Sequence, residues 1–132
     1  MKNEGFSLIE LLTVVAIIGI LATLALSNFS MFKTNAINAT AASDARSVVP
    51  AADLASTESP LPDPLPITFG PDGGPIPELA RFGARSSPGT YGTVNFPAPN
   101  QYFIQAYQLN GNLCYTVING VMTVDPQPCG GP

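Results

Sequence analysis

The sequence contains no histidine and no tryptophan, and its only cysteines are Cys114 and Cys129. Histidine is the side chain that most often serves as a general base or a zinc ligand near neutral pH. No nucleophile–base pair, metal-ligand cluster or phosphate-binding glycine loop stands out among the other residues. We therefore expect no catalytic residues, no metal site and no cofactor, and we expect that the protein is not an enzyme.

Positive charge is also scarce. The chain has five Lys and Arg residues against nine Asp and Glu, so its net charge is −4. A surface that binds nucleic acid in general needs a basic stripe to neutralise phosphates. Nucleic-acid binding of this kind is therefore not expected.

One long apolar run is present, from Phe6 to Leu26. As a helix it would be about 31 Å long, which is enough to cross the hydrocarbon core of a membrane. Glu10 interrupts the run, and a charged side chain at the centre of a spanning helix costs about 2.5–3.5 kcal/mol. The sequence thus predicts a membrane span that retains a costly carboxylate.

A secretory signal peptide is the alternative interpretation of this run. Lys2 would provide the charged start, and Ala25-Leu26-Ser27 fits the small-residue rule for cleavage. The apolar stretch is slightly long for a signal peptide, and Glu10 would have no purpose in one. The membrane span is therefore the preferred interpretation.

A cation that is also inside the membrane, or inside a packed core, would make Glu10 worth keeping. No Lys or Arg lies between Phe6 and Phe32, so the helix cannot supply that cation from its own side chains. The free α-amino group of a neighbouring copy could supply it. That requires cleavage just before the apolar run, between Gly5 and Phe6.

The stretch "KNEGFSLIELLTVVAIIGILATLAL" closely resembles the N-terminus of type IV prepilins and of type II secretion pseudopilins. The resemblance implies that residues 1–5 are a leader, which a prepilin peptidase removes by cutting between Gly5 and Phe6. The same enzyme would then N-methylate Phe6. Glu10 would be the glutamate needed for assembly, paired with the Phe6 amine of the adjacent subunit.

The resemblance also implies partners and a location. The precursor would be a single-pass protein of the inner (cytoplasmic) membrane, where it meets the pilus assembly machinery, and would then polymerise into an extracellular helical filament. The preferred function is the major structural subunit of a type IV pilus. A pseudopilin or minor pilin is the alternative within the superfamily, and a membrane-anchored binding domain that never polymerises is the alternative outside it.

Beyond the span of residues 6–26, we expect residues 27–58 to continue the helix as an amphipathic segment. Apolar residues at helical spacing predict the packed side, and polar residues predict a solvated one. Pro50 lies within this pattern and is expected to kink the helix without ending it. The expected apolar stripe is Phe29, Phe32, Ala36, Ala39, Ala45, Val48, Val49, Ala52 and Ala55, and the expected polar side is Lys33, Asn35, Asn38, Asp44, Arg46 and Asp53.

Residues 59–100 contain ten of the fourteen prolines and six of the twelve glycines. Such a composition does not suit a regular helix or a central strand. We predict a long ordered loop region here, with one short strand near residues 90–96.

Residues 101–132 are predicted to form an antiparallel β-meander, because two Asn-Gly pairs join three β-rich runs. Two-residue turns at these pairs would align Ala106 with Tyr115 and Tyr115 with Val124. The more apolar face should then pack on the helix. That face is Tyr102, Ile104, Ala106, Leu113, Tyr115, Val117, Met122 and Val124.

Cys114 falls on the opposite face of the predicted meander. In a protein delivered outside the cytoplasm, a disulfide between Cys114 and Cys129 is the default interpretation, and two free thiols are the alternative. A C-terminal disulfide loop is also what the resemblance to type IV pilins implies. Together these features predict an α+β fold, in which a long N-terminal helix packs on a small antiparallel sheet.

Overall fold

A computed structural model describes residues 5–63 and 65–129 of the chain. Most of the expected leader, residues 1–4, lies outside the described residues. The chain divides into two compact units, Met1–Lys33 and Thr34–Pro132. One helix, α1 (Leu8–Ser56), contributes to both units, which are described separately below.

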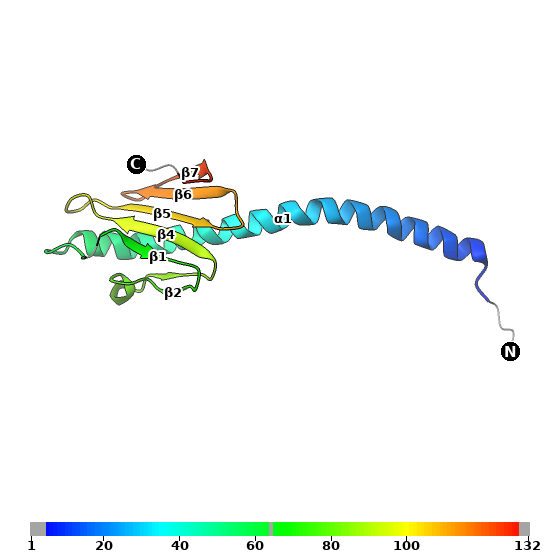
Figure 1. Ribbon diagram of the computed structural model, residues 1–132, viewed down its shortest axis with the longest axis horizontal. Coiled ribbons are helices and arrows are strands. Elements are labelled where there is room, and N and C mark those ends of the chain that lie inside the picture. The colour runs from blue at the N-terminus through cyan, green and yellow to red at the C-terminus, as the bar shows by residue number, and fades with distance from the viewer. Residues whose placement is uncertain (1–4, 64, 130–132) are drawn as a thin grey trace. The chain divides into compact units, whose positions relative to one another are not determined.

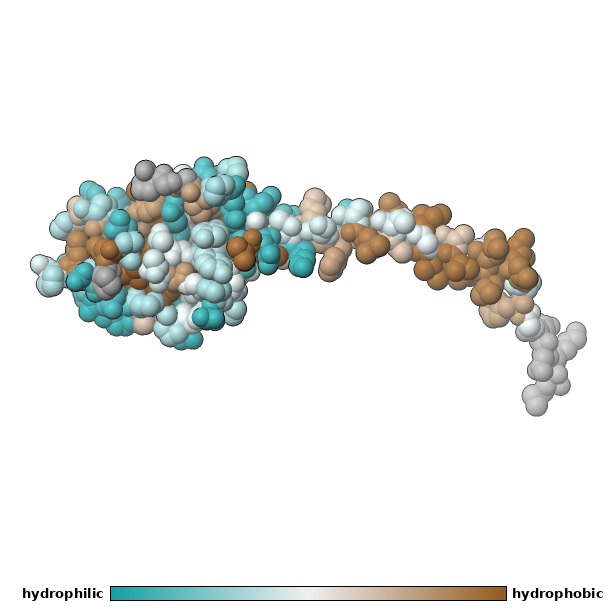
Figure 2. All heavy atoms as spheres, viewed as in Figure 1, coloured by the Kyte–Doolittle hydropathy of each residue, from teal (hydrophilic) through white to brown (hydrophobic). Residues whose placement is uncertain are grey.

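The first unit consists of the apolar half of α1 and the short segment before it. Leu, Ile and Ala dominate here, and no proline precedes Pro50, so helix propensity is high. The large apolar side chains are exposed, and the window that is long and apolar enough to cross a membrane has none of its residues buried. Figure 2 shows them in brown along this part of α1, with some paler residues between them. This surface requires a cover of lipid or of other protein chains.

In the second unit, small side chains of α1 pack on a β-sheet. Ala41, Ala45 and Ala52 are fully buried, and they share one hydrophobic core with residues of the sheet. The predicted faces of the helix were partly wrong. Ala36 and Ala39, expected in the packed stripe, are exposed, whereas two residues expected on the polar side, Asn38 and Asp44, are buried.

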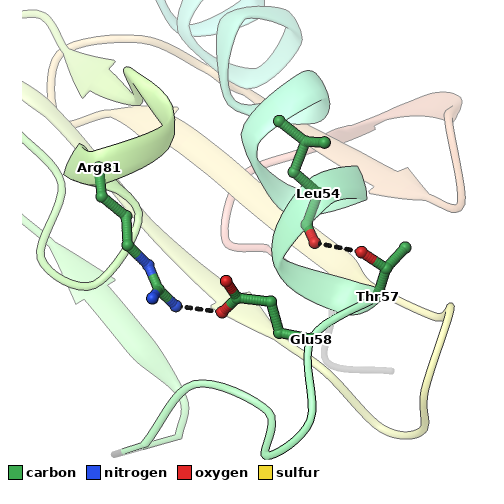
Figure 3. A network of polar contacts seen from close by, with 4 residues as sticks. All are labelled: Leu54, Thr57, Glu58 and Arg81. Atoms are coloured by element: carbon green, nitrogen blue, oxygen red, sulfur yellow. Dashed lines mark hydrogen bonds and ion pairs between the residues drawn. The ribbon is translucent and has the colours of Figure 1, made fainter.

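The helix continues through Pro50, as expected from the periodicity that resumes after the proline, and ends at Ser56, two residues before the predicted end. Just beyond its end, Thr57 Oγ1 donates to the Leu54 carbonyl at 2.7 Å. The Glu58 carboxylate pairs with Arg81 of the 3₁₀-helix η1, which spans Ala80–Phe82 (Figure 3). Both side chains of this pair are partly exposed, so it contributes little to stability.

The sheet has five antiparallel strands in the order β1-β4-β5-β6-β7. Figure 1 shows the sheet in front of the part of α1 that belongs to this unit. The α+β prediction is therefore confirmed, with a larger sheet than the predicted three-strand meander. The strands are β1 (Ile67–Phe69), β4 (Thr90–Asn95), β5 (Phe103–Gln108), β6 (Leu113–Ile118) and β7 (Val121–Pro126).

The predicted register is confirmed, because Ala106 pairs with Tyr115 and Tyr115 pairs with Val124. At the second turn Asn119 and Gly120 both have positive φ, at 47° and 85°, as a two-residue hairpin turn requires. The first turn differs from the prediction. Its hydrogen bond runs from Gly111 N to Gln108 O at 2.9 Å, so its centre is one residue earlier than expected.

The predicted core face also packs on α1. Ile104, Ala106 and Val117 are buried against the helix, together with Val94 of β4. Val124 is the exception, with 49% of its surface exposed. It lies on β7, the edge strand, where no further strand adjoins it.

The Pro/Gly-rich region is more regular than the sequence predicts. It contributes β4 at the predicted place, and β1, which extends the sheet beyond β4. It also forms a small hairpin of β2 (Gly74–Pro75) with β3 (Arg85–Ser86), around η1. Gly92 makes the β1–β4 pairing possible, because a Cβ there would lie 2.2 Å from both the Phe69 ring and the Gln105 carbonyl oxygen.

A buried carboxylate fastens α1 to the start of β4. Asp44 accepts hydrogen bonds from Ser87 N and Ser87 Oγ, both at 2.9 Å, and from Thr90 Oγ1 at 2.5 Å. Gln108 Nε2 donates to the same Thr90 oxygen at 3.1 Å, which connects β5 to the group. These partners explain why a residue expected on the polar side is buried.

Replacing Asp44 by alanine should therefore lower the free energy of unfolding by roughly 2–4 kcal/mol, because one buried donor of Thr90 and two part-buried donors of Ser87 lose their acceptor. Thermal unfolding of the full chain in detergent micelles, followed by circular dichroism, measures the loss. Asp72→Ala is the matched control, because Asp72 is exposed on a loop. Equal unfolding temperatures for the two variants would contradict the proposed role of Asp44.

Candidate processing and assembly site

Glu10 and Ser7 form a reciprocal cap at the start of α1. Ser7 N donates to Glu10 Oε2 at 2.9 Å, and Glu10 N donates to Ser7 Oγ at 3.3 Å. The first helical hydrogen bond, from Leu11 N to Ser7 O at 3.2 Å, begins at the same serine. This is a capping box, which satisfies two backbone donors that a helix start leaves without partners.

The cap also determines where the carboxylate lies. As the third residue of α1, Glu10 is in the first turn, where the helix dipole favours negative charge. In a membrane an unsatisfied backbone N–H costs several kcal/mol, so the Ser7 bond offsets part of the cost of keeping Glu10. Glu10 is thus at the mouth of the apolar run and not at its centre.

Gly5 and Phe6 lie immediately before the helix, in a segment without regular structure. Phe6 is 88% exposed. Among the described residues, a Cβ built on Gly5 meets nothing within 4 Å.

The hydroxyl groups in the apolar run bond to the helix itself. Thr13 Oγ1 donates to Glu10 O at 2.9 Å, Thr23 Oγ1 to Ile20 O at 2.8 Å, and Ser27 Oγ to Leu24 O at 3.0 Å. Their polar atoms are thereby satisfied without water. Glu10 remains the only charged residue from residue 5 to residue 32.

Residues 1–26 match the prokaryotic N-terminal methylation motif. The chain carries the prepilin-type signature. This signature is that of type IV pilins and pseudopilins, a structural and non-enzymatic group. It implies processing by a prepilin peptidase and assembly into filaments, and with the apolar helix it fits a membrane-anchored precursor. Neither the curated proteins nor the solved structures gave a match.

Two features of the prepilin-type segment are found in the structure but were not predicted from the sequence. The first is the role of Ser7 in the cap, although the spacing Ser-x-x-Glu before an apolar run is the signal for a capping box. The second is a backbone partner for Glu10 inside its own chain, where the sequence predicts a partner outside it. The pairing of Glu10 with the Phe6 amine of a second subunit stays a prediction.

The two cysteines are close together in the second unit, where they form a disulfide with Cα atoms 5.3 Å apart. Cys114 is the second residue of β6 and is fully buried, although it lies on the face opposite to α1. The tail is also held by hydrogen bonds. Gln127 N donates to Asn112 O at 3.0 Å, and Gln127 Nε2 donates to Gln108 O at 2.8 Å.

Proposed function

We propose that this protein is the major structural subunit of a type IV pilus. The precursor is held in the inner membrane by α1, is cut between Gly5 and Phe6, and is N-methylated on Phe6. It then joins a helical filament through the apolar half of α1. The observation that carries the proposal is Glu10, which the cap with Ser7 holds at the start of α1, in an apolar half that has no other charged residue up to Phe32.

The geometry gives Glu10 a reason to act between subunits. Its carboxylate lies four residues from the N-terminus that cleavage would create, at the same end of the same helix. When two helices in a filament are displaced along each other by a few residues, the amine of one comes level with the carboxylate of the other. An ion pair formed there, away from water, is a charge-assisted bond that selects one axial displacement.

Cells that express this chain with a pilus assembly system should therefore carry surface filaments built from it. Immunogold electron microscopy detects the filaments, and mass spectrometry of the purified subunit should find a mature chain that begins at N-methyl-Phe6. A strain without the prepilin peptidase is the control and should retain the uncleaved precursor in its membrane.

Other outcomes would assign another function. Processed chains in short envelope-bound structures, without surface filaments, would identify a pseudopilin or minor pilin. Processed chains that remain monomeric in the membrane would identify an anchored binding domain. A mature N-terminus at Asn28 would instead support cleavage of a signal peptide.

A further inference from the structure

The sheet has a second face that is not used by the core. We call it the outer face, because its side chains alternate with those that pack on α1. Strand register arranges them in three rows across the sheet. The residues of the outer face are Thr68, Tyr91, Thr93, Asn95, Phe103, Gln105, Tyr107, Cys114, Thr116, Ile118, Val121, Thr123 and Asp125.

The middle row of the outer face crosses all five strands. It runs through Thr68, Thr93, Gln105, Thr116 and Thr123, which are paired in succession. Four strand spacings make this row about 19 Å wide. Thr116 is buried, whereas Thr68 and Thr123 are exposed and Thr93 and Gln105 are half-buried. The row therefore presents hydroxyl and amide groups on four of its five strands, along a length that several sugar rings could span.

An aromatic pair lies beside this row. The rings of Tyr91 and Tyr107 are stacked, with centroids 5.7 Å apart and an angle of 16° between their planes. Both side chains are half-buried, so part of each ring remains accessible. Aromatic rings of this kind contact the C–H face of a sugar, and a tyrosine hydroxyl adds a hydrogen-bonding group.

The third row, on the other side of the middle one, is apolar at three of its four positions. Phe103, Ile118 and Val121 follow Asn95 across the strands. A shallow pocket of about 250 Å³ lies here and includes Asn95, Phe103 and Ile118 in its lining. A pocket with apolar walls and a few amide groups is a common form of small-ligand site.

Charge is nearly absent from the outer face. Asp125, at the edge strand, is the only one of its thirteen residues that is charged. Figure 2 shows mostly pale residues of intermediate hydropathy in the middle of the visible face of this unit. A surface of aromatic, hydroxyl and amide groups without charge complements a partner that is neutral but rich in hydrogen-bonding groups.

From this arrangement we propose that the outer face binds a neutral polysaccharide. A protein partner would be expected to contact a contiguous apolar core with a polar rim. Here the order is reversed, because the polar Thr/Gln row lies in the middle and the aromatic and apolar rows flank it. The proposal concerns the folded second unit and does not depend on filament formation.

Affinity electrophoresis tests the proposal on the full chain. The protein is solubilised in a detergent that has no sugar headgroup, because a sugar headgroup would compete with the polysaccharide for the site. Native gels contain xyloglucan, galactomannan or mixed-linkage β-glucan as neutral probes, and polygalacturonic acid as the anionic control. We expect at least one neutral polysaccharide to slow migration and the anionic one to have no such effect.

Variants locate the binding surface. Tyr107→Ala should weaken retardation about tenfold, as expected for the loss of one aromatic contact. Thr68→Asp and Thr123→Asp should each reduce binding by placing a charge in the middle row. Thr57→Asp is the matched control, because it adds the same charge beyond the end of α1, and it should bind as the unchanged chain does. Thermal unfolding shows which variants retain the fold.

Three outcomes would overturn the proposal. The first is migration that none of the neutral polysaccharides slows. The second is retardation that Thr57→Asp reduces as much as the two outer-face charges do. The third is a set of folded outer-face variants that bind polysaccharide normally but fail to form filaments, which would assign this face to contacts between copies of the chain.

Discussion

Replacing Glu10 by alanine or by glutamine is expected to reduce filament yield per processed subunit at least about tenfold, which corresponds to the loss of one charge-assisted hydrogen bond. Cleavage and membrane insertion should be unaffected, because both replacements make the apolar helix cheaper to place in lipid. Sedimentation of sheared filaments, quantified against processed subunit in the membrane fraction, measures the effect.

The two replacements separate the two uses of the carboxylate. Glutamine retains an oxygen that can accept the Ser7 N–H bond, so it preserves the cap while removing the charge. Alanine removes both. If pairing with the Phe6 amine of another subunit is what matters, the two variants should assemble equally poorly.

Ser7→Ala is the matched control for the cap. It removes the Oγ acceptor of Glu10 N but keeps the carboxylate and its bond to the backbone of residue 7. Loss of one capping contact costs about 1 kcal/mol of helix stability, so assembly should largely persist. Normal filament yield from Glu10→Gln, with poor yield from Ser7→Ala, would show that capping and not charge is the requirement.

Breaking the Cys114–Cys129 disulfide should lower the free energy of unfolding by roughly 2–5 kcal/mol. The two residues are 15 positions apart, and closing a loop of that size contributes about 3 kcal/mol in the chain-entropy description. For a unit of about 100 residues, 3 kcal/mol corresponds to a decrease in Tm of roughly 12–24 °C. Gln127 continues to hold the tail by hydrogen bonds, so the sheet should still form.

Two single variants separate the bond from the packing around it. Cys129 is half-buried, so Cys129→Ser mainly removes the bond. Cys114→Ser also places a hydroxyl in a fully buried position, and should be at least as destabilising. Thermal unfolding of the full chain in detergent micelles gives both values, and limited proteolysis should show earlier cleavage near the tail. An unchanged Tm for Cys129→Ser would contradict the stabilising role of the bond, and non-reducing peptide mapping tests the pairing directly.

The sequence by itself determined those features that depend on short-range pattern. A long apolar run with high helix propensity favours a helix, so the apolar half of α1 could be predicted directly. The register of β5, β6 and β7 followed from the Asn-Gly turns, because a turn of known length leaves one pairing that keeps apolar residues on one face. The first turn moved by one residue without changing that register.

The tertiary structure decided what depends on partners far apart in the chain. Asn38 and Asp44 are at helical positions that the sequence pattern assigned to the polar side, yet both are buried. Asn112 supplies the hydrogen bonds of Asn38, and Ser87 and Thr90 supply those of Asp44. The addition of β1 to the sheet likewise depends on contact between Phe69 and Gly92, which are 23 positions apart. Hydropathy and spacing report the solvent preference of each side chain, whereas burial of a polar group depends on whether the fold brings it a partner.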